Sequence, residues 1–221
     1  MFAGHFGAGF GAKAAAPRLS LGTLFLAAQF VDLLWPTLLL LGLEQVEIRP
    51  GITRVTPLDF VSYPISHSLA MGVVWGLVLG GIVRALGRTT RSAVVVGLAV
   101  ASHWLLDLIV HRPDLPLAPG LATKVGLGLW GSLPATLAVE LVILGAGVAV
   151  YLRATRARDR AGTIGLWSLV ACLLAIELSN LLGPPPPSVT AIAVVGQAQW
   201  LLVAWGYWID RHREVRAGAG R

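Results

Sequence analysis

His103, Asp107 and His111 repeat at intervals of four residues within one apolar stretch of the chain. In a helix this spacing places the three side chains on one stripe, each about 40° round and about 6 Å along from the last. The stretch from Ser92 to Val110 otherwise has the composition of a membrane-spanning helix. Ionisable groups inside a membrane are costly and rarely unpaired, so they indicate a functional site by default. Two imidazoles and a carboxylate on one face could form half of a metal site. The simpler alternative is a buried His–Asp pair that ties two helices together.

Two further ionisable residues lie in or beside apolar runs. Asp32 falls near the middle of the first long run, and Pro36, one turn later, is expected to kink that helix and free the Asp32 carbonyl. His67 follows Ser66, a candidate N-cap, at the start of the second run. Simpler interpretations stay open here too. Asp32 could be a protonated or hydrogen-bonded carboxylate, and His67 could be a polar anchor at the membrane interface.

Four more polar residues could support such a site. His111 and Asp114 are either ligands, hydrogen-bond partners of ligands or polar loop residues at the mouth of the site. Glu140 and Glu177 lie in later apolar runs, where they could orient ligands or line a cavity. Glu177 could equally be a protonated group between packed helices.

The composition is that of an integral membrane protein. Of the 221 residues, 56% are hydrophobic and 13% are charged, and the mean hydropathy is +0.75. A soluble domain would carry roughly a quarter charged residues. The net charge of +6 could indicate nucleic-acid binding. The arginines, however, lie in short clusters between apolar runs, which is how orientation is set in a bilayer. We therefore expect a membrane lipid or lipid-like partner and no nucleic acid.

Six apolar runs reach the length of around 20 residues that a bilayer crossing needs. They lie at about 20–43, 67–83, 92–111, 134–152, 163–183 and 190–209. Arginines follow the second, fourth and sixth runs, and the positive-inside rule places these loops and the C-terminus in the cytoplasm. The sequence thus predicts an all-α, polytopic helix bundle of six spans, one domain over residues 1–221, in a bacterial-type inner membrane. His67, His103 and Asp107 then lie in the outer half.

The first 16 residues are small, apolar and rich in glycine, with no basic residue before Lys13. One interpretation is an interfacial segment on the cytoplasmic side. The other is a short helix or re-entrant segment that starts on the outer side and runs inward to Lys13. Only in the second case does His5 face the same side as the other histidines.

The order of these residues resembles that of a known family. The LexA-regulated, inner-membrane metal-dependent hydrolase family DUF457 has similar elements in the same order. In this chain they are His5, Asp32, Ser66-His67-Ser68 and Ser102-His103-x-x-x-Asp107. The resemblance covers residues 1–115. It implies a membrane-embedded hydrolase with five candidate metal ligands: His5, Asp32, His67, His103 and Asp107.

The leading hypothesis is a metal-dependent hydrolase that acts on a lipid-linked or amphiphilic ester or phosphoester at the outer leaflet. Histidine and carboxylate ligands suit a divalent ion, with zinc the expected metal. Such an ion lowers the pKa of a bound water and polarises the scissile group. Asp107 or Asp32, whichever is not a direct ligand, is the expected general base. The rivals are a transporter or permease that binds a proton or a metal ion in transit, and a non-catalytic membrane scaffold.

Overall fold

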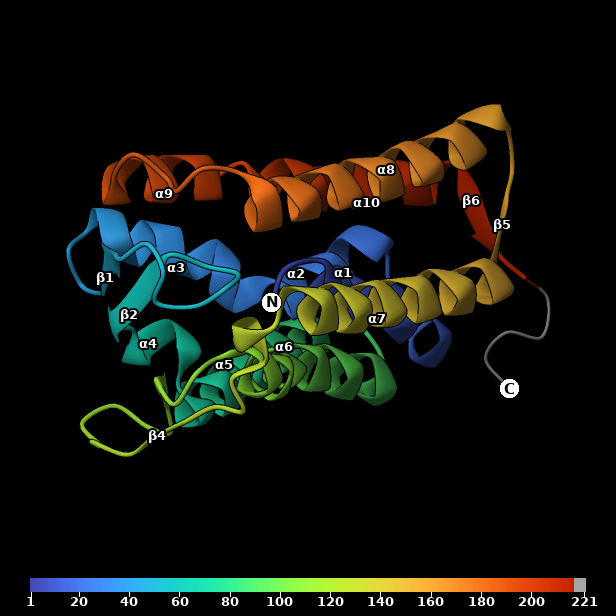
Figure 1. Cartoon of the computed structure of the whole chain (residues 1–221). Helices are drawn as coiled ribbons and strands as arrows, with labels where there is room; N and C mark the ends of the chain where they lie inside the picture. Colours follow the sequence, from blue (N-terminus) through green and yellow to red (C-terminus); the bar gives the residue numbers. More distant parts are fainter. Residues whose placement is uncertain (217–221) are drawn as a thin grey trace.

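The computed structural model describes residues 1–216 and is mostly helical, with short strands at both ends of the helix bundle (Figure 1). The helices are α1 (Ala3–Ala15), α2 (Leu21–Ala28), α3 (Phe30–Leu40), α4 (Pro64–His67), α5 (Leu69–Ala85), α6 (Thr90–Val110), α7 (Leu133–Ala154), α8 (Arg160–Leu182), α9 (Val189–Gly196) and α10 (Gln199–Arg211). A 3-10 turn, Leu129–Gly131, precedes α7.

The strands of the described range form small antiparallel pairs that the all-α prediction did not include. The pairs are β1 (Gln45–Ile48) with β2 (Leu58–Ser62), β3 (Leu115–Pro116) with β4 (Lys124–Val125), and β5 (Thr155–Ala157) with β6 (Arg213–Val215). The first two pairs and α4 lie at one end of the bundle, which we call the hairpin end (Figure 1). The β5–β6 pair lies at the opposite end.

Four helical segments within residues 1–216 are long and apolar enough to span a membrane: α6, α7, α8 and the segment Val189–Arg211, which contains α9 and α10. The bent pair α2 and α3 gives a fifth if it counts as one span. The remaining predicted run, 67–83, corresponds to α5, an apolar helix of only 17 residues. The helices thus indicate a membrane protein, but six spans are not confirmed.

The first long apolar run is broken at Gln29, where α2 and α3 meet at 56°. The expected kink was at Pro36, but this proline lies inside α3 and the bend precedes it. Gln29 has φ −103° and ψ 6°. These angles lie outside the helical region and interrupt the regular hydrogen-bond pattern of the helix. At this break the carbonyl oxygen of Ala28 accepts a hydrogen bond from His103 on α6.

The N-terminal helix α1 lies inside the bundle. The side chains of Phe6 and Phe10 are fully buried, so the structure favours the short helix over the interfacial segment. α1 approaches α7 so closely that backbone meets backbone. A Cβ added at Gly7 would lie 2.6 Å from the carbonyl oxygen of Ile143, and one at Gly147 would collide with the Gly7 carbonyl. Glycine is required at this crossing because no side chain fits between the two helices.

Aromatic rings fill the bundle around α1. Phe6 and Phe10 both meet Phe25 edge to face, with ring centroids 5.0 and 4.9 Å apart, and Phe10 also contacts Tyr151 at 5.3 Å. This geometry is the one aromatic rings prefer, because the positive edge of one ring meets the negative face of the other. The core therefore sits between the hairpin end and the β5–β6 end.

A partly buried ion pair fixes the far end of α1. The Nζ atom of Lys13 donates to Asp210 Oδ2 and to the carbonyl oxygen of Leu19, both at 2.6 Å, and the Tyr151 hydroxyl donates to Asp210 Oδ1 at 3.1 Å. α1 thus runs from the hairpin end toward the β5–β6 end.

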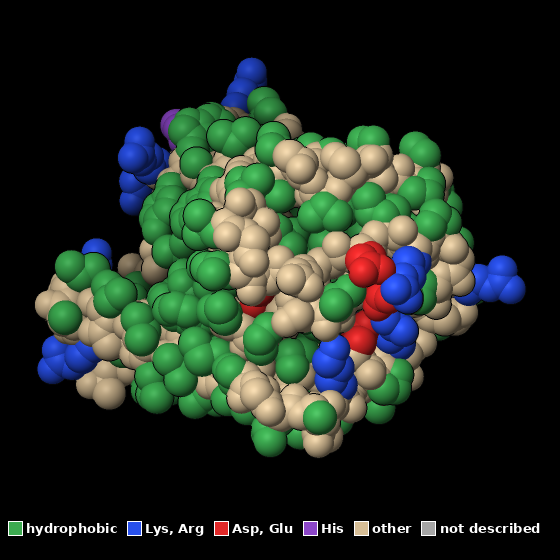
Figure 2. Space-filling model, turned by 90° about the vertical axis from the view of Figure 1, so that its left-hand side faces the viewer, with side chains coloured by type: hydrophobic (Ala, Val, Ile, Leu, Met, Phe, Trp, Pro, Cys, Tyr) green, Lys and Arg blue, Asp and Glu red, His purple; other side chains and the backbone are tan. Residues whose placement is uncertain are grey.

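Charged groups also gather on the surface of the hairpin end. Figure 2 looks onto this end and shows acidic and basic side chains clustered at one place, with apolar side chains over much of the remaining face. The ion pairs of this end join Arg49 to Glu47 and Asp59, and Arg112 to Asp59 and Asp114.

Candidate functional site

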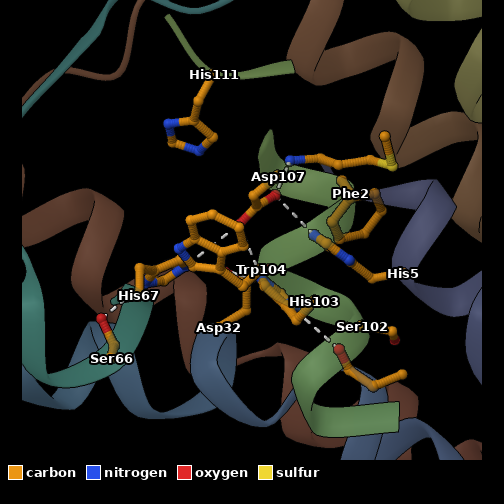
Figure 3. Close-up of polar contacts among 12 residues, drawn as sticks. Phe2, His5, Asp32, Ser66, His67, Ser102, His103, Trp104, Asp107 and His111 are labelled. Carbon is orange, nitrogen blue, oxygen red and sulfur yellow. Dashed lines mark hydrogen bonds and ion pairs between the residues drawn. The ribbon is translucent and has the colours of Figure 1, made fainter. Parts of the chain in front are cut away.

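Five ionisable side chains from four helices meet in one cluster near the hairpin end (Figure 3). His5 comes from α1, Asp32 from α3, His67 from the end of α4, and His103 and Asp107 from α6. Asp32 is the most accessible, with 19% of its side chain exposed, whereas the other four are at most 6% exposed. The structure thus brings together the five residues that the sequence singled out as candidate ligands.

The two oxygens of Asp107 face different partners. Oδ1 lies 3.0 Å from His5 Nε2 and 2.9 Å from the amino group of Met1. Oδ2 lies 3.2 Å from His103 Nε2 and 3.9 Å from His67 Nε2. The carboxylate therefore lies between the Met1 amino group and His5 on one side and the imidazoles of His67 and His103 on the other.

Asp32 faces the same two imidazole nitrogens from α3. Its Oδ1 lies 3.2 Å from His67 Nε2 and 3.6 Å from His103 Nε2. The two aspartates and the two imidazoles therefore enclose one small polar space.

The backbone of the α2–α3 break fixes the His103 ring. Nδ1 lies 2.8 Å from the Ala28 carbonyl oxygen, and because a carbonyl can only accept, Nδ1 carries the proton. The lone pair then belongs to Nε2, which points toward the aspartates and has no hydrogen-bond partner within residues 1–216. Histidines that bind metals are held in this way, with the second ring nitrogen donating to a carbonyl or carboxylate.

A serine and a glutamate fix the His67 ring in the same sense. The Ser66 hydroxyl donates to Glu44 Oε2 at 2.6 Å and therefore accepts from His67 Nδ1, also at 2.6 Å. Glu44 Oε1 accepts the backbone N–H groups of Ile65 and Ser66 at 2.8 Å. Glu44 is buried and was missed as a site residue, because it follows an apolar run and no spacing links it to His67.

Glu140 and Glu177 hold α1 and do not reach the candidate ligands directly. Glu140 accepts the backbone N–H groups of Phe2 and Gly4 at 3.0 Å, and Glu177 accepts that of Ala3 at 3.4 Å. The first N–H groups of a helix have no partner within the helix, and carboxylates are favourable there. The two glutamates therefore anchor the turn of α1 that carries His5.

His111 and Asp114 lie at the mouth of the site. His111 Nδ1 lies 2.9 Å from Asp114 Oδ1, and the Tyr63 hydroxyl reaches the same carboxylate at 3.4 Å. Arg112 binds the other oxygen of Asp114 at 2.9 Å. Burial lowers the pKa of His111 below its ordinary value and raises that of the Tyr63 phenol. At neutral pH the imidazole is therefore neutral and the phenol keeps its proton.

A cavity of about 1160 Å³ adjoins the cluster. One side of it is lined by polar residues of the site: Asp32, His67, Asp107 and His111. Its other walls come from the loop 50–58, the proline turn 184–187 and residues of α8, α9 and α10, most of them apolar. This volume exceeds the range of roughly 300–1,000 Å³ that is typical of small-molecule pockets.

The cluster fits a divalent metal ion. His5, His103 and Asp107 form one group whose ligand atoms lie within 4.8 Å of one another, and Asp32, His67 and His103 form another. Imidazole and carboxylate are ligands that zinc accepts. His5 Nδ1 and His103 Nε2 are buried without hydrogen-bond partners in the described range. His103 belongs to both groups but offers a single lone pair at Nε2, so it can serve one ion at a time.

Comparison with protein-family models, with curated protein sequences and with solved structures gives no match to this chain, so its function rests on the geometry of the cluster and cavity.

Proposed function

We propose that the protein is a membrane-embedded, metal-dependent hydrolase that cleaves an ester or phosphoester of a lipid-linked or amphiphilic substrate. The observation that carries this proposal is the junction of a buried cluster of three histidines and two aspartates with a large cavity of mostly apolar walls. Polar groups at one wall and apolar side chains elsewhere match a molecule with a reactive head group and an apolar tail.

The two aspartates differ in a way that suggests their roles. A divalent ion, with zinc the best fit, would lower the pKa of a water and polarise the scissile bond. Asp107 is 2% exposed and holds His5 and His103, which suits a ligand. Asp32 is 19% exposed and lines the cavity, so it can reach a water or a substrate. We therefore assign Asp32 as the general base and His5, His67, His103 and Asp107 as the ligands.

The membrane arrangement that fits this role has six crossings in a bacterial-type inner membrane, with α5 as a short sixth span. Arginines gather at the β5–β6 end, for example Arg156, Arg158 and Arg213. The positive-inside rule then puts this end and the C-terminus in the cytoplasm. The hairpin end faces outward, and a substrate with its head group at the outer leaflet reaches the cluster from there.

The packing beyond the cluster favours an enzyme over a transporter. Phe6, Phe10 and Phe25 are fully buried in contact with one another, on the side of the cluster away from the hairpin end. A transporter would need a path through this core to the other side. A catalyst needs access from one side only.

Elemental analysis of the detergent-purified protein tests whether the cluster binds a metal ion. We expect close to stoichiometric divalent metal in the wild type and its loss in His103→Ala. His212→Ala is the matched control, because His212 lies at the β5–β6 end and pairs with Asp159 at 2.8 Å. It should retain the metal. Equal metal content in His103→Ala and the wild type would contradict the assignment.

Turnover on a panel of long-chain phosphate esters, phospholipids and carboxylic esters in phosphatidylcholine nanodiscs tests the chemistry. We expect hydrolysis of at least one member, lost in Asp32→Asn and after chelation. Metal transport into proteoliposomes without any hydrolysis would reject the hydrolase in favour of a transporter. If the protein contains no metal, hydrolyses nothing and transports nothing, the hypothesis of a non-catalytic membrane scaffold is favoured.

A further inference from the structure

The cavity beside the cluster contains one unpaired cationic side chain, that of Arg54. Within residues 1–216 it is the only Lys or Arg side chain that lines the cavity. Its neighbour Arg49 pairs with Glu47 and Asp59, and Arg112 also pairs with Asp59. Arg54 makes no such ion pair in the described range. Arg54 is exposed, so its charge is hydrated and available to a ligand.

The loop that carries Arg54 is well ordered by its own hydrogen bonds. The Thr53 hydroxyl donates to the Thr56 carbonyl and accepts the Thr56 N–H, both at 2.8 Å. The backbone N–H of Arg54 donates to the Trp130 carbonyl at 3.0 Å. The Trp130 ring in turn lies 4.2 Å from the His111 ring, centroid to centroid. Arg54 is thus held beside the mouth of the site.

A second group with unsatisfied hydrogen-bonding capacity lies on α3. The Nε1 atom of Trp35 is buried without a hydrogen-bond partner in the described range, and Trp35 lines the cavity. Its ring meets that of His67 edge to face, with centroids 6.2 Å apart. An indole N–H can only donate, and because this atom has almost no accessible surface, a ligand oxygen reaches it only if the Trp35 side chain turns toward the cavity. The cavity therefore presents a cation and a donor, both of which suit an anionic oxygen.

The far wall of the cavity is apolar. It is lined by two residues of α8, two of α10 and the proline turn: Cys172, Ile176, Leu202, Trp205 and 184–187. Such a wall matches a hydrocarbon chain in polarity, as in pockets that hold amphiphilic ligands.

We propose that the substrate is an anionic phosphoester amphiphile whose phosphate binds between the cluster, Arg54 and Trp35 Nε1, with its apolar chain along α8 and α10. This inference rests on the proposed function and narrows its substrate from esters in general to phosphoesters. A neutral carboxylic ester would make no ion pair with Arg54. Bonds between charged groups are stronger than neutral ones, and a guanidinium is well shaped for phosphate.

Binding of a non-hydrolysable probe tests the inference independently of turnover. The probe is dodecyl phosphonate, added to the full chain with its metal in phosphatidylcholine nanodiscs. Cys172, the one cysteine of the chain, reports occupancy through its rate of alkylation by N-ethylmaleimide. We expect the phosphonate to slow alkylation in a saturable manner. Inorganic phosphate should give no protection, which separates an amphiphile from free phosphate.

Two variants and a matched control complete the test. Arg54→Gln should raise the Kd for dodecyl phosphonate by roughly tenfold to a hundredfold. Trp35→Phe keeps the ring and removes only the N–H, so we expect an increase of about threefold to tenfold. Arg49→Gln removes a cation from the same hairpin that is already paired, and should leave the Kd unchanged. Monododecanoyl glycerol, an uncharged ester of the same chain length, should bind the wild type and Arg54→Gln alike.

The outcomes separate this inference from the proposed function. An unchanged phosphonate Kd in Arg54→Gln, or equal protection by the phosphonate and the glycerol ester, would overturn the inference even if the protein binds metal and hydrolyses carboxylic esters. Arg54-dependent binding in a protein that hydrolyses nothing would overturn the hydrolase and leave the phosphoester site standing.

Discussion

The imidazole rings of His5 and His103 stack almost in parallel, with centroids 3.5 Å apart and an angle of 10° between their planes. This contact joins α1 to α6 at the centre of the cluster. His5 also reaches Asp107 through Nε2 at 3.0 Å. His5 therefore has two separable roles, as a flat packing surface and as a nitrogen donor.

His5→Phe separates these two roles. The phenyl ring keeps the stack on His103 and removes both nitrogens, so we expect a folded protein whose metal affinity is lower by at least about tenfold. Competition with a chromophoric chelator measures the affinity, and circular dichroism checks the fold. An affinity equal to that of the wild type would remove His5 from the ligand set.

Glu44→Gln tests the chain of hydrogen bonds behind His67. The change removes the negative charge of the carboxylate that accepts the hydrogen bond from the Ser66 hydroxyl. The His67 ring is then held less firmly, so metal affinity should fall about 10- to 100-fold. Glu47→Gln is the control from the same hairpin, because Glu47 is 54% exposed and pairs only with Arg49 at its surface. An equal loss in both variants would point to general damage to the hairpin.

Gly147→Ala should destabilise the protein, because its methyl group would meet the backbone of α1 at Gly7. Overpacking of this kind costs about 1–3 kcal/mol, and the upper end applies where both sides are backbone. A Cβ at Gly145, two residues earlier on α7, has no atom within 4 Å. Thermal unfolding in detergent should therefore show a clearly lower melting temperature for Gly147→Ala and almost no change for Gly145→Ala. Equal melting temperatures would mean that α1 and α7 are not packed this closely.

Lys13→Met should destabilise the β5–β6 end without affecting the metal. It leaves the carboxylate of Asp210, which is 16% exposed and keeps its bond from the Tyr151 hydroxyl, without its lysine partner, at a cost of about 1–3 kcal/mol. The double variant Lys13→Met/Asp210→Leu removes both charges and should recover much of that loss. Denaturant titration gives the stabilities, and elemental analysis of the same samples should find wild-type metal content. Loss of metal in the single variant would show that the two ends are coupled.

Acid should weaken the N-terminal cap of α8. Asp159 accepts a hydrogen bond from His212, which lowers the pKa of this carboxyl below its ordinary value. A carboxyl with a lowered folded-state pKa contributes stability above its unfolded value of about 4, and the contribution is lost as pH falls below it. His212→Ala should therefore move the acid-unfolding midpoint to slightly higher pH. A midpoint that does not move would mean that the pair adds no stability.

The sequence predicted the helices well, because hydropathy is a local pattern, whereas the set of five candidate ligands rests on the family resemblance and on the predicted topology. Each predicted apolar run coincides with a helix or a bent pair, and the four-residue spacing of His103 and Asp107 does place both in the cluster. Hydropathy measures only how apolar a run is. It therefore could not tell that α1 is buried in the interior.

What the sequence could not predict depends on contacts between distant segments. Glu44 reaches Ser66 only because β1 and β2 fold back on each other, and the Ala28 carbonyl is available to His103 only because the helix breaks at Gln29. Pro36 was the more obvious signal for a bend. Gln29 carries no such signal, and its side-chain amide is buried without a partner in the described range.

The anchoring of α1 by late helices sets an order of assembly. The bond between Phe2 and Glu140 spans 138 positions of the chain, and that between Ala3 and Glu177 spans 174. During synthesis, the segment that carries His5 has neither carboxylate to dock on until α7 and α8 have been made. Such long-range closure is slow, because chain entropy is lost before any contact is gained. The five side chains of the cluster can therefore come together only after synthesis has passed α8.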